Sequence, residues 1–235
     1  MNKIAVVSIF YNTNFLLESL YGSFIKNSNI SADFFIFDNS TNKDKQISSK
    51  QIENKNITIE YLQYDLFNKS FGSKMHCMSI QFAFDKLLTI YDYLILLDSD
   101  VIITGDLSKI IDTMDSENYD IAGWHDGKKG APRNLIHPSF LFVKTKNIIK
   151  YNIKFFDENR IIEKGKLPLT YDTGMSFYED VLKNDLRVLE LKFNKNYNHF
   201  GCGSRAYIPG KYTKNKKSTH YDINTWLSDL YEYYK

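Results

Sequence analysis

Two aspartates stand directly after an apolar run in the stretch YLILLDSDVIIT, residues 93–104. Only Ser99 separates Asp98 from Asp100, and a second apolar run begins at Val101. Two carboxylates beside a hydrophobic strand repel each other and lose hydration, and a divalent cation offsets both costs. Mg²⁺ and Mn²⁺ favour such oxygen ligands, and Mg²⁺ commonly completes its shell with substrate phosphates. The pair therefore predicts a metal ion that carries a diphosphate.

The first half of the chain alternates short apolar runs with amphipathic segments. The apolar runs predict strands at residues 3–10, 34–37, 57–64 and 93–97, and the amphipathic segments predict helices at 15–26 and 73–90. We expect the run Asn12-Thr13-Asn14 to cap the first helix. This alternation of strands and helices favours a parallel sheet with helices on both faces.

Polar residues follow three of the expected strands. Tyr11 and Asn12 follow the first, Asp38 and Asn39 follow the second, and the Asp98–Asp100 group follows the fourth. Ligands of open parallel sheets bind beyond the carboxyl ends of the strands, so these groups are expected to share one edge. Asn and Asp also begin many turns, so one such cluster alone would be a weak signal.

The second half of the chain has a mixed pattern. It predicts strands at 121–124, 140–143 and 187–193, a short helix at 106–114, a helix within 169–183, and a C-terminal helix with its apolar face between 223 and 234. No linker or repeat separates the halves. We therefore expect one domain over 1–235, with a nucleotide-binding half at 1–105 and a substrate-side half at 106–235.

The apolar strand, Asp-x-Asp and renewed apolar run resemble the DXD motif of GT-A fold glycosyltransferases. VSIFYN and FDNS resemble the nucleotide-sugar half of the family-2-type enzymes, and GSKMHCMSIQFAFDKL resembles the helix before their motif. The segments YDTG and HFG, from Tyr171 and His199, resemble their acceptor-side and C-terminal motifs. The resemblance spans most of residues 3–205. It implies an α/β GT-A fold with a Rossmann-like, mostly parallel central sheet flanked by helices and a mixed acceptor-side second half.

The same resemblance implies a role for each matching residue. Asp100 would ligate Mn²⁺ or Mg²⁺, Asp98 would lie near the ribose or the metal, and His199 would be a late metal ligand. His220 is an alternative to His199, which is favoured because Gly201 and Gly203 allow the backbone to approach phosphate closely. Asp38 would contact the base of the nucleotide, with Tyr11 and Asn12 beside it. The residues expected to bind the donor are Tyr11, Asn12, Asp38, Lys74, His76, Asp98, Ser99 and Asp100, and Arg205 and Lys211 are further candidates to neutralise the diphosphate.

The general base that accepts the acceptor proton would be Asp172. The family-2-type base often stands in an acidic pair, and Glu179-Asp180 is such a pair, so Asp180 is the alternative. His125 and His137 flank the loop GKKGAPR, and we expect both at the surface. On the acceptor side, Trp124 and His125 are the candidate contacts.

Composition excludes several other classes of protein. The 235 residues are 43% hydrophobic and 25% charged, with a formal net charge of +2, which does not suggest a nucleic-acid-binding protein. Two cysteines are too few for a disulfide framework or a zinc site of their own. No apolar stretch approaches the roughly 18 residues of a membrane span. We expect a cytoplasmic protein. The basic stretch KYTKNKK is a candidate for peripheral contact at the inner face of the membrane, but the acidic residues Asp222, Asp229 and Glu232 of the neighbouring helix fit docking on the protein's own core better.

These patterns favour a metal-dependent hexosyltransferase of the inverting type that takes part in surface-glycan synthesis. The donor would be a UDP-sugar rather than a GDP-sugar, and the acceptor would be a hydroxyl of a glycan or a lipid-linked intermediate. Three alternatives remain: a retaining enzyme with the same nucleotide half, a phosphatase-like hydrolase with an Asp nucleophile, and a non-catalytic carbohydrate-binding domain. The hydrolase ranks low because its Asp-x-Asp normally follows the first strand.

Overall fold

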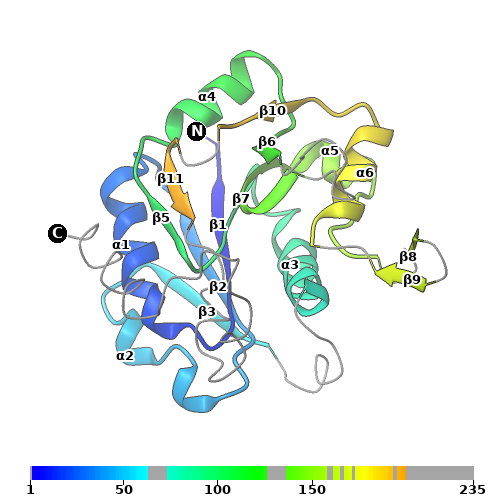
Figure 1. Cartoon of the computed structure of the whole chain (residues 1–235). Helices are drawn as coiled ribbons and strands as arrows, with labels where there is room; N and C mark the ends of the chain where they lie inside the picture. The colour runs from blue at the N-terminus through cyan, green and yellow to red at the C-terminus, as the bar shows by residue number, and fades with distance from the viewer. Residues whose placement is uncertain are drawn as a thin grey trace, which may run out of the picture.

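The computed structural model describes residues 2–62, 73–125, 136–157, 161–164, 167–170, 173–192 and 195–199. Side chains are described for these residues except 73, 74 and 161–170. Two layers of helices enclose a central sheet (Figure 1). Within the described residues, no helix is long and apolar enough to cross a membrane.

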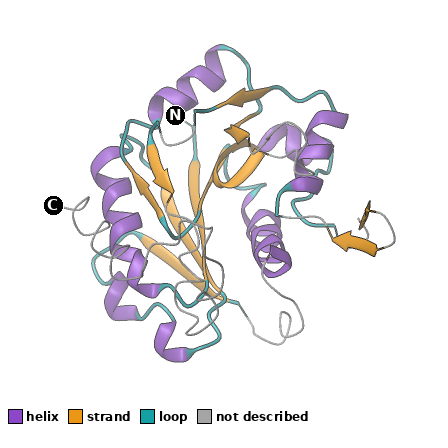
Figure 2. Cartoon of the chain, in the orientation of Figure 1, coloured by secondary structure: helices purple, strands orange, loops and turns teal. Residues whose placement is uncertain are grey.

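The central sheet has seven strands in the order β10-β6-β7-β4-β1-β2-β3. Figure 2 colours the strands orange. Strands β1, β2, β3 and β4 are parallel, and β6 and β10 are parallel to each other. Strand β7 runs antiparallel between β4 and β6. The strands are β1 (Ile4–Phe10), β2 (Asp33–Asp38), β3 (Ile57–Tyr61), β4 (Tyr93–Leu97), β6 (Ile121–His125), β7 (Ile136–Lys144) and β10 (Val188–Glu190).

Helices cover both faces of the sheet because successive strand side chains point to opposite sides. On one face, Val6 and Ile95 pack with α1 (Leu17–Asn27) and α4 (Ser108–Ser116). On the other face, their neighbours Val7 and Leu96 pack with α3 (Ser73–Leu87), α5 (Thr145–Lys150) and α6 (Met175–Lys183). The expected mostly parallel α/β sheet with helices on both faces is confirmed.

A second, two-stranded sheet lies beside the main one. Strand β5 (Val101–Ile103) follows β4 after a short turn and pairs antiparallel with β11 (Tyr197–His199). The remaining described elements are the 3₁₀ turns η1 (Asn14–Leu16) and η2 (Lys43–Lys45), the short helix α2 (Ser49–Ile52), and the hairpin of β8 (Ile161–Lys164) and β9 (Leu167–Thr170).

Several boundaries differ from those expected. Strand β3 ends at Tyr61 rather than at residue 64, and β7 begins at Ile136 rather than at residue 140. The expected cap of the first helix is wrong, because the Thr13 side chain makes no capping bond and its hydroxyl instead donates to Ser99 Oγ at 3.2 Å. Strand β11, helix α5 and the hairpin of β8 and β9 were not expected. The expected C-terminal helix lies outside the described residues.

Candidate metal and substrate site

Three side chains of the predicted metal site meet beyond the carboxyl end of β4. Asp98 follows β4 directly, Asp100 precedes β5, and His199 ends β11. The antiparallel register pairs His199 with Val101, so the second sheet places the histidine opposite the aspartate pair. Two segments that are far apart in the sequence therefore form one site.

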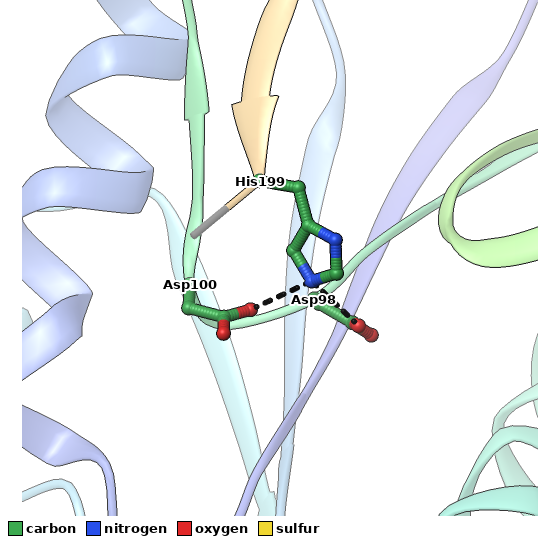
Figure 3. A group of neighbouring side chains, drawn as sticks. All are labelled: Asp98, Asp100 and His199. Carbon is green, nitrogen blue, oxygen red and sulfur yellow. Dashed lines mark ion pairs between the residues drawn. The ribbon is translucent and has the colours of Figure 1, made fainter. Parts of the chain in front are cut away.

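The geometry of this group fits a divalent cation. One ligand atom from each of Asp98, Asp100 and His199 lies within 4.8 Å of the other two. His199 Nε2 is 3.5 Å from Asp98 Oδ2 and 3.3 Å from Asp100 Oδ1, and Figure 3 shows this nitrogen facing both carboxylates. Adjacent ligands that are each about 2.1 Å from an octahedral ion are about 3 Å apart, so small shifts would let all three bind one ion.

Electrostatics couple the three groups strongly. Burial opposes charge on the imidazole, but hydrogen bonds and attraction from Asp100 and Asp98 raise the pKa of His199 to about 10. Burial also opposes charge on Asp98, but a hydrogen bond from His199 and the nearby His76, His199 and His137 rings hold its pKa below the ordinary value. A proton on His199 balances one of the two carboxylates. A divalent ion in place of that proton would balance both, so the donor set suits such an ion.

His76 faces a different carboxylate oxygen of Asp98 from the one that His199 faces. It lies on α3, and its Nε2 is 3.5 Å from Asp98 Oδ1. The backbone of Asp98 is held as well, because its N–H donates to the Ser139 carbonyl at 3.0 Å. Ser99 accepts the bond from Thr13, which precedes η1. His76 and Ser99 thus lie beside the metal group, and their donor-binding roles stay predictions.

The sequence did not reveal the part played by His137. We expected it at the surface, but it is half-buried, stacks on Trp124 with ring centroids 4.7 Å apart, and lies 5.7 Å from the His199 ring. Ser139 holds the stack in place. Its hydroxyl lies 2.8 Å from His137 Nδ1, and Trp124 Nε1–H donates to that hydroxyl at 3.3 Å. The stacked rings of Trp124 and His137, held by Ser139, therefore lie next to the candidate metal site.

The other acceptor-side candidate, His125, is half-buried rather than fully exposed. It ends β6 and contacts Tyr178 of α6 edge to face, at 5.8 Å between ring centroids. This contact ties the end of β6 to the N-terminal turns of α6, which begins after Gly174. Gly174 has φ +85°, a conformation that favours glycine, so its position at the start of α6 follows from backbone geometry.

The predicted nucleotide-base residues lie at the ends of β1 and β2. Tyr11 and Asn12 are half-buried, and Asn12 adopts φ 58°. Asp38 is fully buried, and its two oxygens accept bonds from backbone amides. Asn39 donates from Nδ2 to Ser79 of α3 at 2.9 Å. Direct contact of Asp38 with a base stays a prediction.

Several predicted residues are not placed. Asp172, the first candidate for the base, lies outside the described residues, as do Arg205, Lys211 and His220. Lys74 belongs to α3, but its side chain is not described. The alternative base, Asp180, is half-buried within α6 beside the exposed Glu179.

Comparisons with known protein families and with curated proteins found no match. Solved structures share the fold at low sequence identity. S. aureus TarS matches with a TM-score of 0.58 and 16% identity over 84% of this chain. An active-site mutant of LgtC matches with 0.51 and 17% over 80%, and the glycosyltransferase GlyE of Streptococcus pneumoniae TIGR4 with 0.50 and 17% over 82%.

This chain spans 36% of the TarS chain, 46% of GlyE and 72% of LgtC. The likeness is therefore one of fold. Together with the sheet order and the helices on both faces, it defines the fold as the α/β GT-A fold that the sequence predicted.

Proposed function

We propose that the protein is a metal-dependent glycosyltransferase that moves a sugar from a nucleotide-diphosphate donor to a hydroxyl acceptor. One observation carries the proposal: Asp98, Asp100 and His199 converge beyond the carboxyl end of β4 in a GT-A fold. This is the edge at which open α/β sheets bind ligands. In a hydrolase with an Asp nucleophile the Asp-x-Asp normally follows the first strand rather than β4, and a carbohydrate-binding domain without chemistry would need no such convergence of three metal ligands.

The donor would bind at the same edge of the sheet. Asp98, Asp100 and His199 would hold Mn²⁺ or Mg²⁺, and the ion would stabilise the diphosphate as it leaves. The donor would be a UDP-sugar rather than a GDP-sugar, bound in the half formed by residues 1–105. The residues proposed to surround it are Tyr11, Asn12, Asp38, Lys74, His76 and Ser99.

The proposed reaction is one inverting displacement of hexose. The acceptor hydroxyl oxygen forms a bond to the anomeric carbon while the bond from that carbon to the diphosphate oxygen breaks. The hydroxyl proton passes to a carboxylate, for which Asp172 is the first candidate and Asp180 the second. Trp124 and His125, in the half formed by residues 106–235, would contact the acceptor.

The proposed setting is surface-glycan synthesis at the cytoplasmic face of the membrane, with a glycan or lipid-linked acceptor. The support for this is the resemblance seen in the sequence, together with the basic stretch KYTKNKK.

The direct test is to incubate the protein with UDP- and GDP-sugars, with Mn²⁺ or with a chelator, and to measure release of the nucleoside diphosphate. We expect release that needs the metal and that is faster with UDP-sugars. NMR of the product should show inverted anomeric configuration, whereas retained configuration would favour the retaining alternative. Absence of turnover with every donor and acceptor, although UDP and Mn²⁺ bind, would favour a binding domain.

The base is tested by a matched pair of variants. Asp172→Asn should lower transfer by roughly 10²–10⁴-fold and leave donor binding near that of the wild type, because only proton acceptance is lost. Asp180→Asn should cost much less. The reverse ranking would move the base to Asp180, and full activity in both variants would exclude this base mechanism.

A further inference from the structure

Both oxygens of the Asp38 carboxylate accept hydrogen bonds from the backbone of the segment that follows Asp38. The residue is 0% exposed. Its Oδ1 accepts the Ser40 N–H at 2.9 Å, and its Oδ2 accepts the Ile47 N–H at 2.8 Å. A buried carboxylate is costly unless such donors surround it, and here each oxygen has one. One side chain thus fastens both ends of the segment 40–47, which we call the anchored segment.

The anchored segment in turn holds the end of β1. Asn12 N–H donates to Ser40 Oγ at 2.7 Å, and Asn12 Nδ2 donates to Thr41 Oγ1 at 3.3 Å. In the opposite direction, Asn42 N–H donates to Asn12 Oδ1 at 3.2 Å. Asn12 adopts φ 58°, a conformation that asparagine tolerates better than most residues with a side chain, and these bonds hold it there. The position of the β1 end therefore depends on the anchored segment.

Two further bonds attach the same segment to its surroundings. Asn14 Nδ2 donates to the Gln46 carbonyl at 3.2 Å, and Tyr61 Oη donates to the Ile47 carbonyl at 2.5 Å. The hydrogen bonds thus join the ends of β1, β2 and β3 through one short stretch of chain. Removing the carboxylate that closes this stretch would release all of them together.

We propose that Asp38 is a positioning residue that sets the nucleotide-binding edge through the anchored segment, rather than a group that reads the base itself. Each oxygen could accept a second bond, but the residue is 0% exposed, so a base could reach the carboxylate only if the chain that covers it moved. This inference rests on the proposed function only for the nature of the ligand. The anchoring itself belongs to the protein without any ligand.

The first experiment compares Asp38→Asn with Asp44→Asn, which alters an exposed carboxylate in the same segment. Hydrogen exchange of the free protein should be at least about tenfold faster across the anchored segment and at Asn12 in Asp38→Asn, and unchanged in Asp44→Asn. With Mn²⁺ present, calorimetry should show UDP and GDP affinities lowered by a similar factor, on the order of tenfold, because the whole edge loses its order.

The opposite pattern would overturn the inference. If Asp38→Asn leaves exchange unchanged but alters the ratio of UDP to GDP affinity, Asp38 reads the base directly. If the variant does not fold, NMR of the wild-type protein provides the test. Ser40 and Ile47 amides that stay protected when UDP and Mn²⁺ are added support anchoring, and their exposure on addition contradicts it. Failure of the wild type to bind either nucleotide would count against the proposed function, while exchange would still test the anchoring.

Discussion

Two acidic sites stand at the same edge of the sheet and are built in opposite ways. At the end of β2, the oxygens of Asp38 accept from the amides of Ser40 and Ile47. At the end of β4, the oxygens of Asp98 face the imidazoles of His76 and His199, each at 3.5 Å. The first carboxylate is fully buried, whereas the side chain of the second is 21% exposed.

The two sites differ in whether the hydrogen-bond partners of the carboxylate can release a proton. A backbone amide keeps its proton, so the bonds of Asp38 can only hold the chain in place. An imidazole can exchange a proton for a metal ion, so the contacts of Asp98 can change while the fold stays the same. The same residue type at corresponding strand ends thus serves structure in one place and, under the proposed function, ligand exchange in the other.

The largest expected effect is at Asp100, the more buried of the two carboxylates at the β4 site. Asp100→Asn should weaken Mn²⁺-dependent UDP binding by at least about a hundredfold, because groups that merely support metal ligands already cost 10–100-fold when changed. Calorimetry measures this, with Asp112→Asn on an exposed position of α4 as the control. Unchanged affinity in Asp100→Asn would show that the metal does not bind at this site. The contrast between this site and Asp38 would then no longer hold.

The second prediction concerns pH. The pKa of His199 is raised to about 10, so a metal ion must displace a proton throughout the neutral range. Mn²⁺ affinity should therefore fall as pH is lowered, by roughly a hundredfold between pH 8.5 and 6.5. An unperturbed imidazole would confine the loss to pH values near and below about 6.5.

His199→Gln is the control for that pH dependence. It should bind Mn²⁺ more weakly than the wild type and show a nearly flat profile over the same range. A wild-type profile that is already flat above pH 7 would show that metal binding does not displace a proton from a His199 imidazole with a raised pKa.

A smaller effect is expected at His76, which faces the other oxygen of Asp98. His76→Ala should weaken Mn²⁺-dependent UDP binding by about tenfold, because Asp98 loses the group that orients it. His76→Gln should recover part of the affinity, since its amide can still donate toward Oδ1. Equal losses in both variants would argue against this orienting bond and for a role of the imidazole in contact with the donor.

The smallest effect concerns stability without metal. The folded pKa of His199 lies above its unfolded value of about 6.5, so the stability it contributes is present below that pH and lost as pH rises through about 10. The melting temperature of the metal-free protein should fall by several degrees between pH 8 and 10.5. The fall should be smaller in His199→Gln, and an equal fall in both proteins would place its cause elsewhere.

Much of this edge could be predicted because its signals are local. The runs that form β1, β2 and β4 are apolar and short, and Asp98 and Asp100 interrupt such a run within three residues. The bond from Asp38 to the Ser40 amide is also local, since aspartate often accepts from the amide two residues later. The bond to the Ile47 amide crosses a loop and has no signal of its own.

The features that could not be predicted from the sequence depend on contacts between distant segments. Strand β11 has only three residues and exists because β5 pairs with it, so no periodic pattern marks it. We expected His137 at the surface because it flanks the loop GKKGAPR, yet β7 begins at Ile136 and brings His137 to Trp124. The pairing of His199 with Asp100 came from the family resemblance, because spacing alone gives no reason for it.

The candidate metal site can form only after β11 has been synthesised and has paired with β5. A ribosome adds about 5–20 residues per second, so His199 follows Asp100 by on the order of 5–20 s. During that interval the two aspartates lack the imidazole of His199. Pairings between such distant segments also form slowly, because the closure of a long loop opposes them. The site is therefore completed late in folding, after the strands that carry its aspartates have had time to assemble.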